Sequence, residues 1–223
     1  MDRILINKTG STNKERRGFD LQLYSPDQQI MADIVVGIVN QFCEQTIDPA
    51  GLYILSMAIA GLGRVPGDIV EVGVYRGRSA ATMLETSLVT IGHEKHFHLF
   101  DTFTGVPDKS FRGSKQSKKP GFVRHEYLRP YAGRFTTHKG IFPEETGSVL
   151  NGKGVSFAHI DVDTHEYTLK ALDFLYPKMN KGGIFLVHDY SFIQNVRNSV
   201  LEFCRANALP CFELGASYGM IVT

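Results

Sequence analysis

From residue 68 to its end, the chain alternates between short runs rich in β-branched residues and segments of helical length. This alternation is typical of βαβ units, which build a parallel sheet covered by helices. The predicted strands are residues 68–73, 96–101, 134–138, 155–160, 183–187, 211–214 and 218–222. The predicted helices between them are residues 79–91, 122–131, 143–150, 165–176 and 192–207. Such a sheet binds ligands at the carboxyl ends of its strands, so functional residues are expected there.

Both ends of the chain depart from this alternation. The last two predicted strands lie too close together for a helical crossover, so we expect an antiparallel hairpin at the sheet edge. That hairpin argues against a purely parallel dinucleotide-binding fold. Before residue 68, apolar residues at helical spacing predict two helices, one beginning near Asp27 and one covering residues 52–62.

The composition fits one globular domain with nearly balanced charge. Its 223 residues, 43% of them hydrophobic, suffice for one sizeable core. The 24 Lys and Arg residues nearly equal the 23 Asp and Glu residues, so neither nucleic acid nor a membrane surface is expected as a partner. No apolar run approaches the ~20 residues that span a bilayer, and residues 1–20 lack the apolar stretch of a signal peptide. Cys43, Cys204 and Cys211 have no CxxC spacing, which favours reduced thiols and a cytoplasmic protein.

A glycine-containing turn, EVGVYRGRS at residues 71–79, joins the first predicted strand to the next helix. Its glycines let the backbone approach a ligand closely over a helix N-terminus. The pattern is E-x-G-x-x-x-G rather than G-x-G-x-x-G, and Glu71 would repel a pyrophosphate. A ligand with a cationic amino-acid end, such as S-adenosylmethionine, suits that carboxylate better. We predict that the cofactor-binding residues of this turn are Glu71, Gly73, Tyr75, Gly77 and Ser79. The alternative is a plain strand-to-helix turn.

The next predicted strand ends at an acidic residue, Asp101. A carboxylate in this place can accept hydrogen bonds from both ribose hydroxyls of a nucleoside. We therefore predict that Asp101 binds the cofactor, with Thr102 beside it. Alternatively, Asp101 caps the turn formed by residues 102–105.

Three more aspartates follow two later strands of the predicted sheet. Asp161 and Asp163 end one strand, and His188 and Asp189 end the next. Because adjacent strands lie ~4.8 Å apart, Asp161 and Asp189 can share a cation. We predict a divalent metal, with magnesium as the first choice and His188 or water completing its shell. Asp163 is then free to act as the general base that takes a proton from a substrate hydroxyl.

Helix capping is the alternative explanation for these aspartates. Asp163 or Thr164 could cap the helix that begins near residue 165, and Asp189 or Ser191 could cap the helix after it. Capping accounts for Asp163 but leaves Asp161 without a role.

Four segments, in this order, resemble the macrocin O-methyltransferase family: GDIVEVGVYRG, LFDTFTGVPD, KGIFPEET, and HIDVD followed by YTLKALDFLYPKMNKGGIFLVHDY. The resemblance covers about residues 67–203. Members of that family are metal-dependent enzymes that use S-adenosylmethionine to methylate sugar hydroxyls of natural products. The resemblance implies an α/β, Rossmann-like class I methyltransferase fold, whose seven-stranded sheet is mostly parallel and has an antiparallel last strand.

The resemblance also assigns roles to residues at matching positions. It puts Glu71, Gly73 and Gly77 in the cofactor turn, Asp101 on the ribose, Gly140, Ile141 and Phe142 near the adenine, Asp161 and Asp189 on the metal, and Asp163 in the role of base. We count Asp161 among the cofactor-binding residues as well.

One position departs from the family pattern. The family usually carries two consecutive aspartates where this chain has His188 and Asp189. Imidazole is a poor ligand for magnesium, so the site could bind the ion more weakly, shift toward manganese, zinc or iron, or have lost the ion. A buried histidine with its hydrogen bonds satisfied is the alternative for His188.

The resemblance implies a two-part organisation and an enzyme. Residues 1–66 are expected to form an N-terminal arm and helical lid that shapes the acceptor pocket, and residues 67–223 the cofactor-binding domain. A lysine-rich loop at residues 108–124 could close over the substrate or be plain solvated surface. The predicted activity is methylation of a hydroxyl on a small molecule of sugar or natural-product type, and a homo-oligomer is compatible with it. The alternatives are a degenerate methyltransferase that binds the cofactor without catalysis and, further off, a nicotinamide oxidoreductase.

Overall fold

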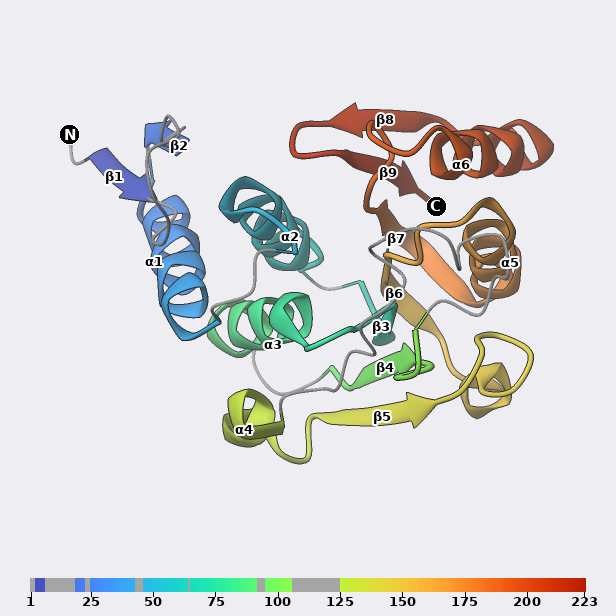
Figure 1. The fold of residues 1–223 in the computed structure, drawn as a ribbon, viewed down its shortest axis with the longest axis horizontal. Helices are drawn as coiled ribbons and strands as arrows, with labels where there is room; N and C mark the ends of the chain where they lie inside the picture. Colours follow the sequence, from blue (N-terminus) through green and yellow to red (C-terminus); the bar gives the residue numbers. More distant parts are fainter. Residues whose placement is uncertain are drawn as a thin grey trace.

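The structure, a computed structural model, describes residues 3–6, 19–22, 25–42, 46–63, 65–91, 95–105 and 125–223. Its centre is a seven-stranded sheet in the order β5-β4-β3-β6-β7-β9-β8 (Figure 1). The strands are β3 (Asp68–Val72), β4 (Phe97–Asp101), β5 (Phe135–Lys139), β6 (Val155–Ile160), β7 (Met179–Val187), β8 (Cys211–Leu214) and β9 (Tyr218–Val222). The first five are parallel, whereas β9 runs antiparallel to both β7 and β8. The predicted hairpin is confirmed, and its second strand, β9, lies between β7 and β8.

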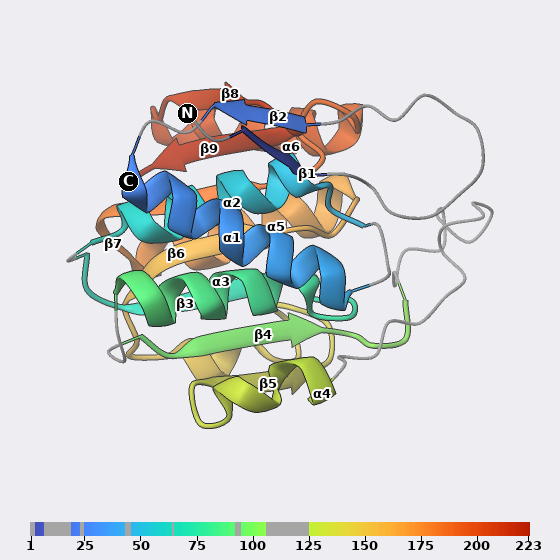
Figure 2. The same ribbon diagram turned by 90° about the vertical axis from the view of Figure 1, so that its left-hand side faces the viewer.

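Helices cover both faces of this sheet (Figures 1 and 2). On one face lie α1 (Pro26–Gln41), α2 (Pro49–Gly61) and α3 (Arg78–Thr90), and on the other lie α5 (His165–Leu175) and α6 (Gln194–Asn207). The short α4 (His125–Leu128) lies beside β5. This is the predicted mixed α/β architecture of class I methyltransferases, with the antiparallel strand at the expected place.

The strands alternate between two apolar cores. Ile69, Phe97 and Leu99 pack toward α1, α2 and α3. Phe100 and Phe185 pack toward α5 and α6. All six residues of β6 are buried, as expected for a central parallel strand that is covered on both faces. The ends of these central strands are therefore held rigidly.

Side-chain caps fix where several helices begin. Ser25 and Gln28 form a capping box at α1, and Asp48 accepts a 2.7 Å hydrogen bond from the Gly51 amide at α2. Thr164 caps α5 by accepting from the Tyr167 amide, and Ile193 precedes α6 without a side-chain cap. The capping explanation thus fails for both Asp163 and Asp189, since Thr164 takes the first role and no side chain takes the second.

Some predicted elements differ from the observed ones. The predicted helix at 143–150 is only a 3₁₀ turn, Gly147–Leu150, in a segment bounded by glycines at 140 and 152. The helix predicted at 122–131 is α4 followed by a 3₁₀ turn, because Pro130 cannot continue a regular helix. Strand β7 begins at Met179, four residues before the predicted start at Gly183.

The N-terminal part holds two short strands that the sequence patterns missed. Strand β1 (Arg3–Ile6) pairs antiparallel with β2 (Phe19–Gln22). Helices α1 and α2 pack on α3, and Arg78 Nη1 donates to the Ile47 carbonyl at 3.1 Å. The division at residue 66 and the role of the first part as a lid stay predictions.

Three other predictions concern residues outside the described ranges: the basic loop at 108–124, the state of Cys43, and the start of the 122–131 helix. Among the helices that are described, none combines the length and apolarity needed to cross a membrane.

Candidate active site

The glycine turn after β3 has the backbone shape that its sequence requires. Gly73 and Gly77 have φ values of 91° and 88°, and Tyr75 between them has 50°. A Cβ on Gly73 would lie 1.9 Å from the carbonyl oxygen of Asp161, so no other residue fits there. Gly77 begins α3 without a side-chain cap. An anionic group at this helix N-terminus would meet the partial positive charge of the first turn.

Asp101 holds this turn in place. One carboxylate oxygen accepts from the amides of Val74 and Tyr75 at 2.8 and 2.7 Å, and the other accepts from the Phe103 amide at 2.7 Å. Asp101 thus caps the turn at residues 102–105, as the alternative explanation proposed. The same carboxylate also holds the glycine turn after β3. Oδ2 therefore accepts two hydrogen bonds and Oδ1 accepts one, which leaves one lone pair, on Oδ1, for a ribose hydroxyl. The Thr102 hydroxyl donates to the Gly105 carbonyl at 2.7 Å, within its own turn.

Glu71 points into the protein. Its side chain is fully buried, and Oε1 lies 2.9 Å from Nδ1 of His159 on the neighbouring strand β6. Burial raises the pKa of the Glu71 carboxyl, and its hydrogen bonds to His159 and Ser79 oppose that rise. Glu71 and Ser79 are therefore engaged inside the fold, and their contact with a cofactor stays a prediction.

The loop after β5 lies next to Asp101. The Gly140 amide donates to the Asp101 carbonyl at 3.0 Å, and the Ile141 amide donates to the Glu145 carboxylate at 2.8 Å. Phe142 is buried between Phe100 and Phe174, with ring centroids 4.6 and 5.3 Å away. Gly140, which the resemblance puts near the adenine, is thus hydrogen-bonded to Asp101, the residue expected on the ribose. The Phe142 ring packs inside the protein.

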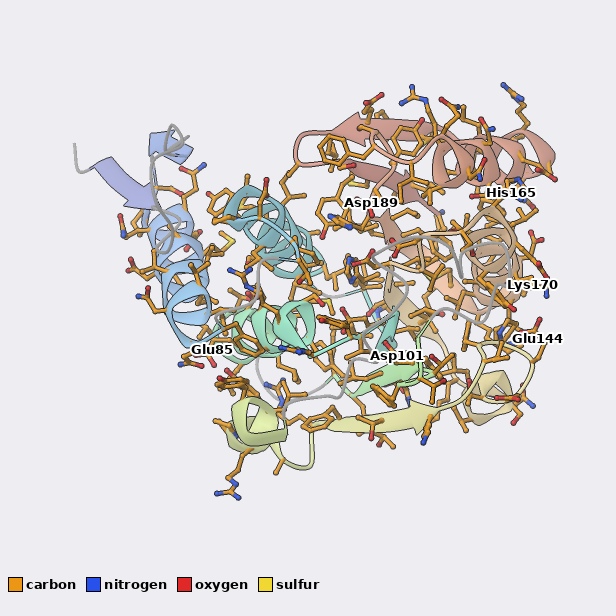
Figure 3. The ribbon with its side chains drawn as sticks, in the orientation of Figure 1. Glu85, Asp101, Glu144, His165, Lys170 and Asp189 are labelled. Atoms are coloured by element: carbon orange, nitrogen blue, oxygen red, sulfur yellow. The ribbon has the colours of Figure 1, made fainter. Side chains whose placement is uncertain are left out.

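The predicted cluster at the ends of β6 and β7 is assembled by strand pairing. Ile160 pairs with Val187, so Asp161 and His188, the residues that follow them, come side by side. His188 Nδ1 lies 3.1 Å from Asp161 Oδ1 and 3.5 Å from Asp189 Oδ1. One ligand atom from each of Asp161, His188 and Asp189 lies within 4.8 Å of the other two. In Figure 3, Asp101 and Asp189 lie toward the middle of the molecule, whereas Glu144, His165 and Lys170 lie at its edge.

Asp163 joins this cluster through a side-chain hydrogen bond to Asp189. Burial and the negative charges of Asp161 and Asp189 raise the pKa of Asp163 to about 8. Burial also raises the pKa of Asp189, whereas the charge and hydrogen bond of His188 outweigh burial and lower the pKa of Asp161. Although burial acts in the opposite direction, the three carboxylates together raise the pKa of His188 to about 9. The cluster therefore has a strong affinity for positive charge.

Backbone strain gathers at the same edge of the sheet. Tyr75, Phe103, Asp163 and Asp189 follow β3, β4, β6 and β7, and each has a φ between 50° and 60°. Non-glycine residues rarely adopt this conformation, which costs about 1–3 kcal/mol and concentrates at functional sites. One strained residue after each of four neighbouring strands marks this edge as the active-site candidate.

The cluster fits a divalent cation. Two carboxylates with one imidazole supply hard oxygen donors and one nitrogen donor. Around an ion with bonds of ~2.1 Å, neighbouring donors lie about 3.0–3.4 Å apart, close to the distances from His188 Nδ1.

Sequence patterns missed Tyr218 on β9. Its hydroxyl lies 3.3 Å from His159 Nε2, and its ring centroid lies 5.0 Å from that of His188. No sequence signal links Tyr218 to residues so far away, because the insertion of β9 beside β7 creates the contact.

Two aromatic residues after β7 have unequal exposure. Tyr190 is buried, and the Arg197 guanidinium lies over its ring. Phe192 is 80% exposed instead, and its amide donates to the Asp189 carbonyl at 3.2 Å. The prediction of a helix from residue 192 obscured this exposed side chain.

Comparison with known proteins gives consistent matches. A model of the macrocin-O-methyltransferase (TylF) family matches residues 56–211. The demethyldecarbamoylnovobiocin O-methyltransferase of Streptomyces niveus is 27% identical over 161 residues, covering 62% of this chain and 58% of that enzyme. A tetracenomycin 4'-O-methyltransferase of Streptomyces olivaceus, which acts on a dimethoxy-rhamnosyl derivative, is 24% identical over 203 residues, covering 82% and 72%.

Solved structures share the fold at lower identity. The O-methyltransferase NovP superimposes with a TM-score of 0.70 at 19% identity, covering 87% of this chain and 97% of NovP. The calicheamicin methyltransferase CalS11 gives 0.65 at 18% identity, covering 90% and 94%. An O-methyltransferase from Bacillus cereus, in complex with SAH, gives 0.56 at 12% identity, covering 91% of each chain.

Proposed function

Because the chain belongs to the macrocin O-methyltransferase (TylF) family, we propose that it transfers a methyl group from S-adenosylmethionine to a hydroxyl of a small molecule. The two curated relatives act on natural products, and the name of one includes a rhamnosyl group. A sugar or a related natural product is therefore the proposed acceptor class. The SAH complex of the Bacillus cereus enzyme, which has the same fold, supports the choice of cofactor.

The cofactor is proposed to lie across the carboxyl ends of β3 and β4. Its amino-acid end faces the glycine turn and the first amides of α3, and its ribose faces Asp101. The adenine then falls beside Gly140 and Ile141. Asp101 serves this arrangement twice, since it fixes the turn and offers the remaining lone pair of Oδ1 to the ribose.

Asp161, His188 and Asp189 are proposed to hold a divalent cation near the acceptor. When bound, such an ion fixes the acceptor oxygen and makes its proton more acidic. Asp163 receives that proton. Asp163 is proposed for this role because it lies beside Asp161 and Asp189, the carboxylates proposed to hold the ion.

The observation that carries this proposal is the convergence of Asp161, Asp163, His188 and Asp189 beside the glycine turn. The carbonyl of Asp161 lies against Gly73, so the acidic cluster and the glycine turn are in direct contact. Alignment and electrostatics can then supply most of the rate enhancement, because the sulfonium methyl group is already reactive. The same convergence argues against a degenerate protein that only binds the cofactor.

Calorimetric titration tests the cofactor assignment. We expect saturable binding of S-adenosylmethionine and SAH and no binding of NAD. Methyl-labelled S-adenosylmethionine should then transfer its label to hydroxylated glycosides in the presence of divalent metal. Binding of NAD without binding of S-adenosylmethionine would instead support the nicotinamide oxidoreductase.

A further inference from the structure

His188 occupies the place of a ligand in the cluster. Its amide donates to the Ile160 carbonyl at 2.9 Å, which continues the ladder between β6 and β7 by one residue. On another side the Tyr218 ring packs against it at 5.0 Å and an angle of 59°. The imidazole is only 12% exposed. Sheet and ring together leave it little freedom to move away from Asp161 and Asp189.

The donor set has a different chemistry from one made of oxygen alone. Mg²⁺ strongly prefers oxygen ligands in octahedral geometry, whereas imidazole suits ions such as Mn²⁺, Fe²⁺, Co²⁺ and Zn²⁺. His188 Nδ1 lies at first-neighbour distances from both carboxylates, 3.1 and 3.5 Å. An ion placed between Asp161 and Asp189 would therefore meet the nitrogen as well.

We infer that the Asp161–His188–Asp189 site selects a first-row transition-metal ion over Mg²⁺, with His188 as a nitrogen ligand. This inference rests on the proposed function, because it takes the cluster to be the place where acceptor oxygen and cation meet. It goes beyond the proposed function because it names a transition-metal ion in place of Mg²⁺, the ion expected for a site made of oxygen ligands alone.

Metal-binding measurements on the full chain, saturated with SAH and kept at one pH, test the inference. MnCl₂ is titrated by electron paramagnetic resonance, and MgCl₂ is added in competition. Pulsed electron paramagnetic resonance of the Mn²⁺ complex should show the hyperfine coupling between the ion and a directly bound nitrogen. In His188→Asp this coupling should vanish, and the preference for Mn²⁺ over Mg²⁺ should fall at least about tenfold, since loss of even an outer-shell partner of a metal ligand typically costs about 10- to 100-fold in metal affinity.

Further variants guard against trivial results. His188→Asn should also lose the nitrogen coupling, and it serves if the Asp variant does not fold, with SAH binding and thermal unfolding as the tests of folding. His165→Asp removes an exposed histidine, 40% accessible and paired with Glu202, and should change neither coupling nor preference.

Two results would overturn the inference: Mn²⁺ bound without nitrogen coupling, or an unchanged Mn²⁺ to Mg²⁺ preference in His188→Asp. These results are distinct from failure of the proposed function. Methyl transfer without nitrogen coupling would remove the inference alone, whereas nitrogen-coupled Mn²⁺ without S-adenosylmethionine binding would remove the proposed function alone.

Discussion

The Glu71 carboxylate and the His159 imidazole lie 2.9 Å apart, and neither side chain has any exposed surface. They join β3 to β6 directly beneath the glycine turn, and the Tyr218 hydroxyl reaches the other ring nitrogen of His159 from β9. Three strands that are distant in sequence are thus tied together by buried polar side chains.

Replacing His159 by Leu should destabilise the protein strongly. The change leaves the Glu71 carboxylate buried without its imidazole partner, and breaking a buried pair in this way costs about 3–5 kcal/mol. Urea unfolding of wild type and His159→Leu measures the loss. The double variant with Glu71→Gln should recover at least about 1 kcal/mol, because it removes the stranded carboxylate. A single-variant loss below about 1 kcal/mol would show that the pair contributes little.

Gly73→Ala should abolish cofactor binding. Its Cβ would overlap the Asp161 carbonyl at 1.9 Å, so the turn, the end of β6, or both must shift. The expected result is no calorimetric binding of S-adenosylmethionine and a loss of stability of more than about 3 kcal/mol, beyond the range of ordinary substitutions. Gly37→Ala is the matched control. Gly37 lies within α1 and a Cβ there would meet no atom within 4 Å, so we expect a gain of about 0.5–1 kcal/mol. Normal binding by Gly73→Ala would contradict the close approach.

Asp163→Asn should stop turnover and leave the affinity for the cofactor unchanged. The amide keeps the size of the side chain but takes up no proton, and loss of a general base typically costs 10²- to 10⁴-fold in rate. Initial rates with labelled S-adenosylmethionine give the turnover, and calorimetry gives the affinity. Equal losses of rate and affinity would refute the assignment of Asp163 as the base.

Phe192→Ala should weaken binding of the acceptor and leave binding of the cofactor unchanged. Phe192 is 80% exposed on the turn that follows Asp189, where an aromatic ring can pack on the apolar face of a sugar. We expect KM for the acceptor to rise several-fold with S-adenosylmethionine affinity unchanged. Phe212→Ala, which removes an exposed ring on β8, is the control. An acceptor KM that responds equally to both substitutions would argue against a specific role for Phe192.

His138→Gln should make the protein less sensitive to acid. Burial, and then the charges of His98 and His96, hold the pKa of His138 below its ordinary value. The unfolded chain then binds more protons than the folded one as pH falls below about 6.5, so stability falls with pH in that window. Because Gln does not titrate, the variant should lose less stability between pH 8 and pH 5.5.

Stability curves measured by urea unfolding across that range check the His138 prediction. The exposed His165, changed to Gln, is the control and should follow wild type. The pKa of Asp68, which the His98 hydrogen bond and nearby positive charges hold low despite burial, affects stability only at more acidic pH. Parallel curves for His138→Gln and wild type would contradict the prediction.

Local patterns in the sequence determined the βαβ order, the closing hairpin, the glycine turn and the positions of Asp161, Asp163 and Asp189 at strand ends. These features depend on neighbours within a few residues, since side-chain alternation and turn chemistry are short-range effects. The resemblance to a known family added the roles of those residues.

The sequence predicted that Asp161, His188 and Asp189 share one site, but only the tertiary structure set their distances and added the contacts of Tyr218. Strand pairing brought His188 within reach of Asp161, and the insertion of β9 beside β7 brought Tyr218 against His159 and His188. It also buried Glu71 against His159, while contact between Glu71 and a cofactor stays a prediction. Contacts between distant segments, and the burial and charge they create, depend on how the sheet is assembled, which no local pattern encodes.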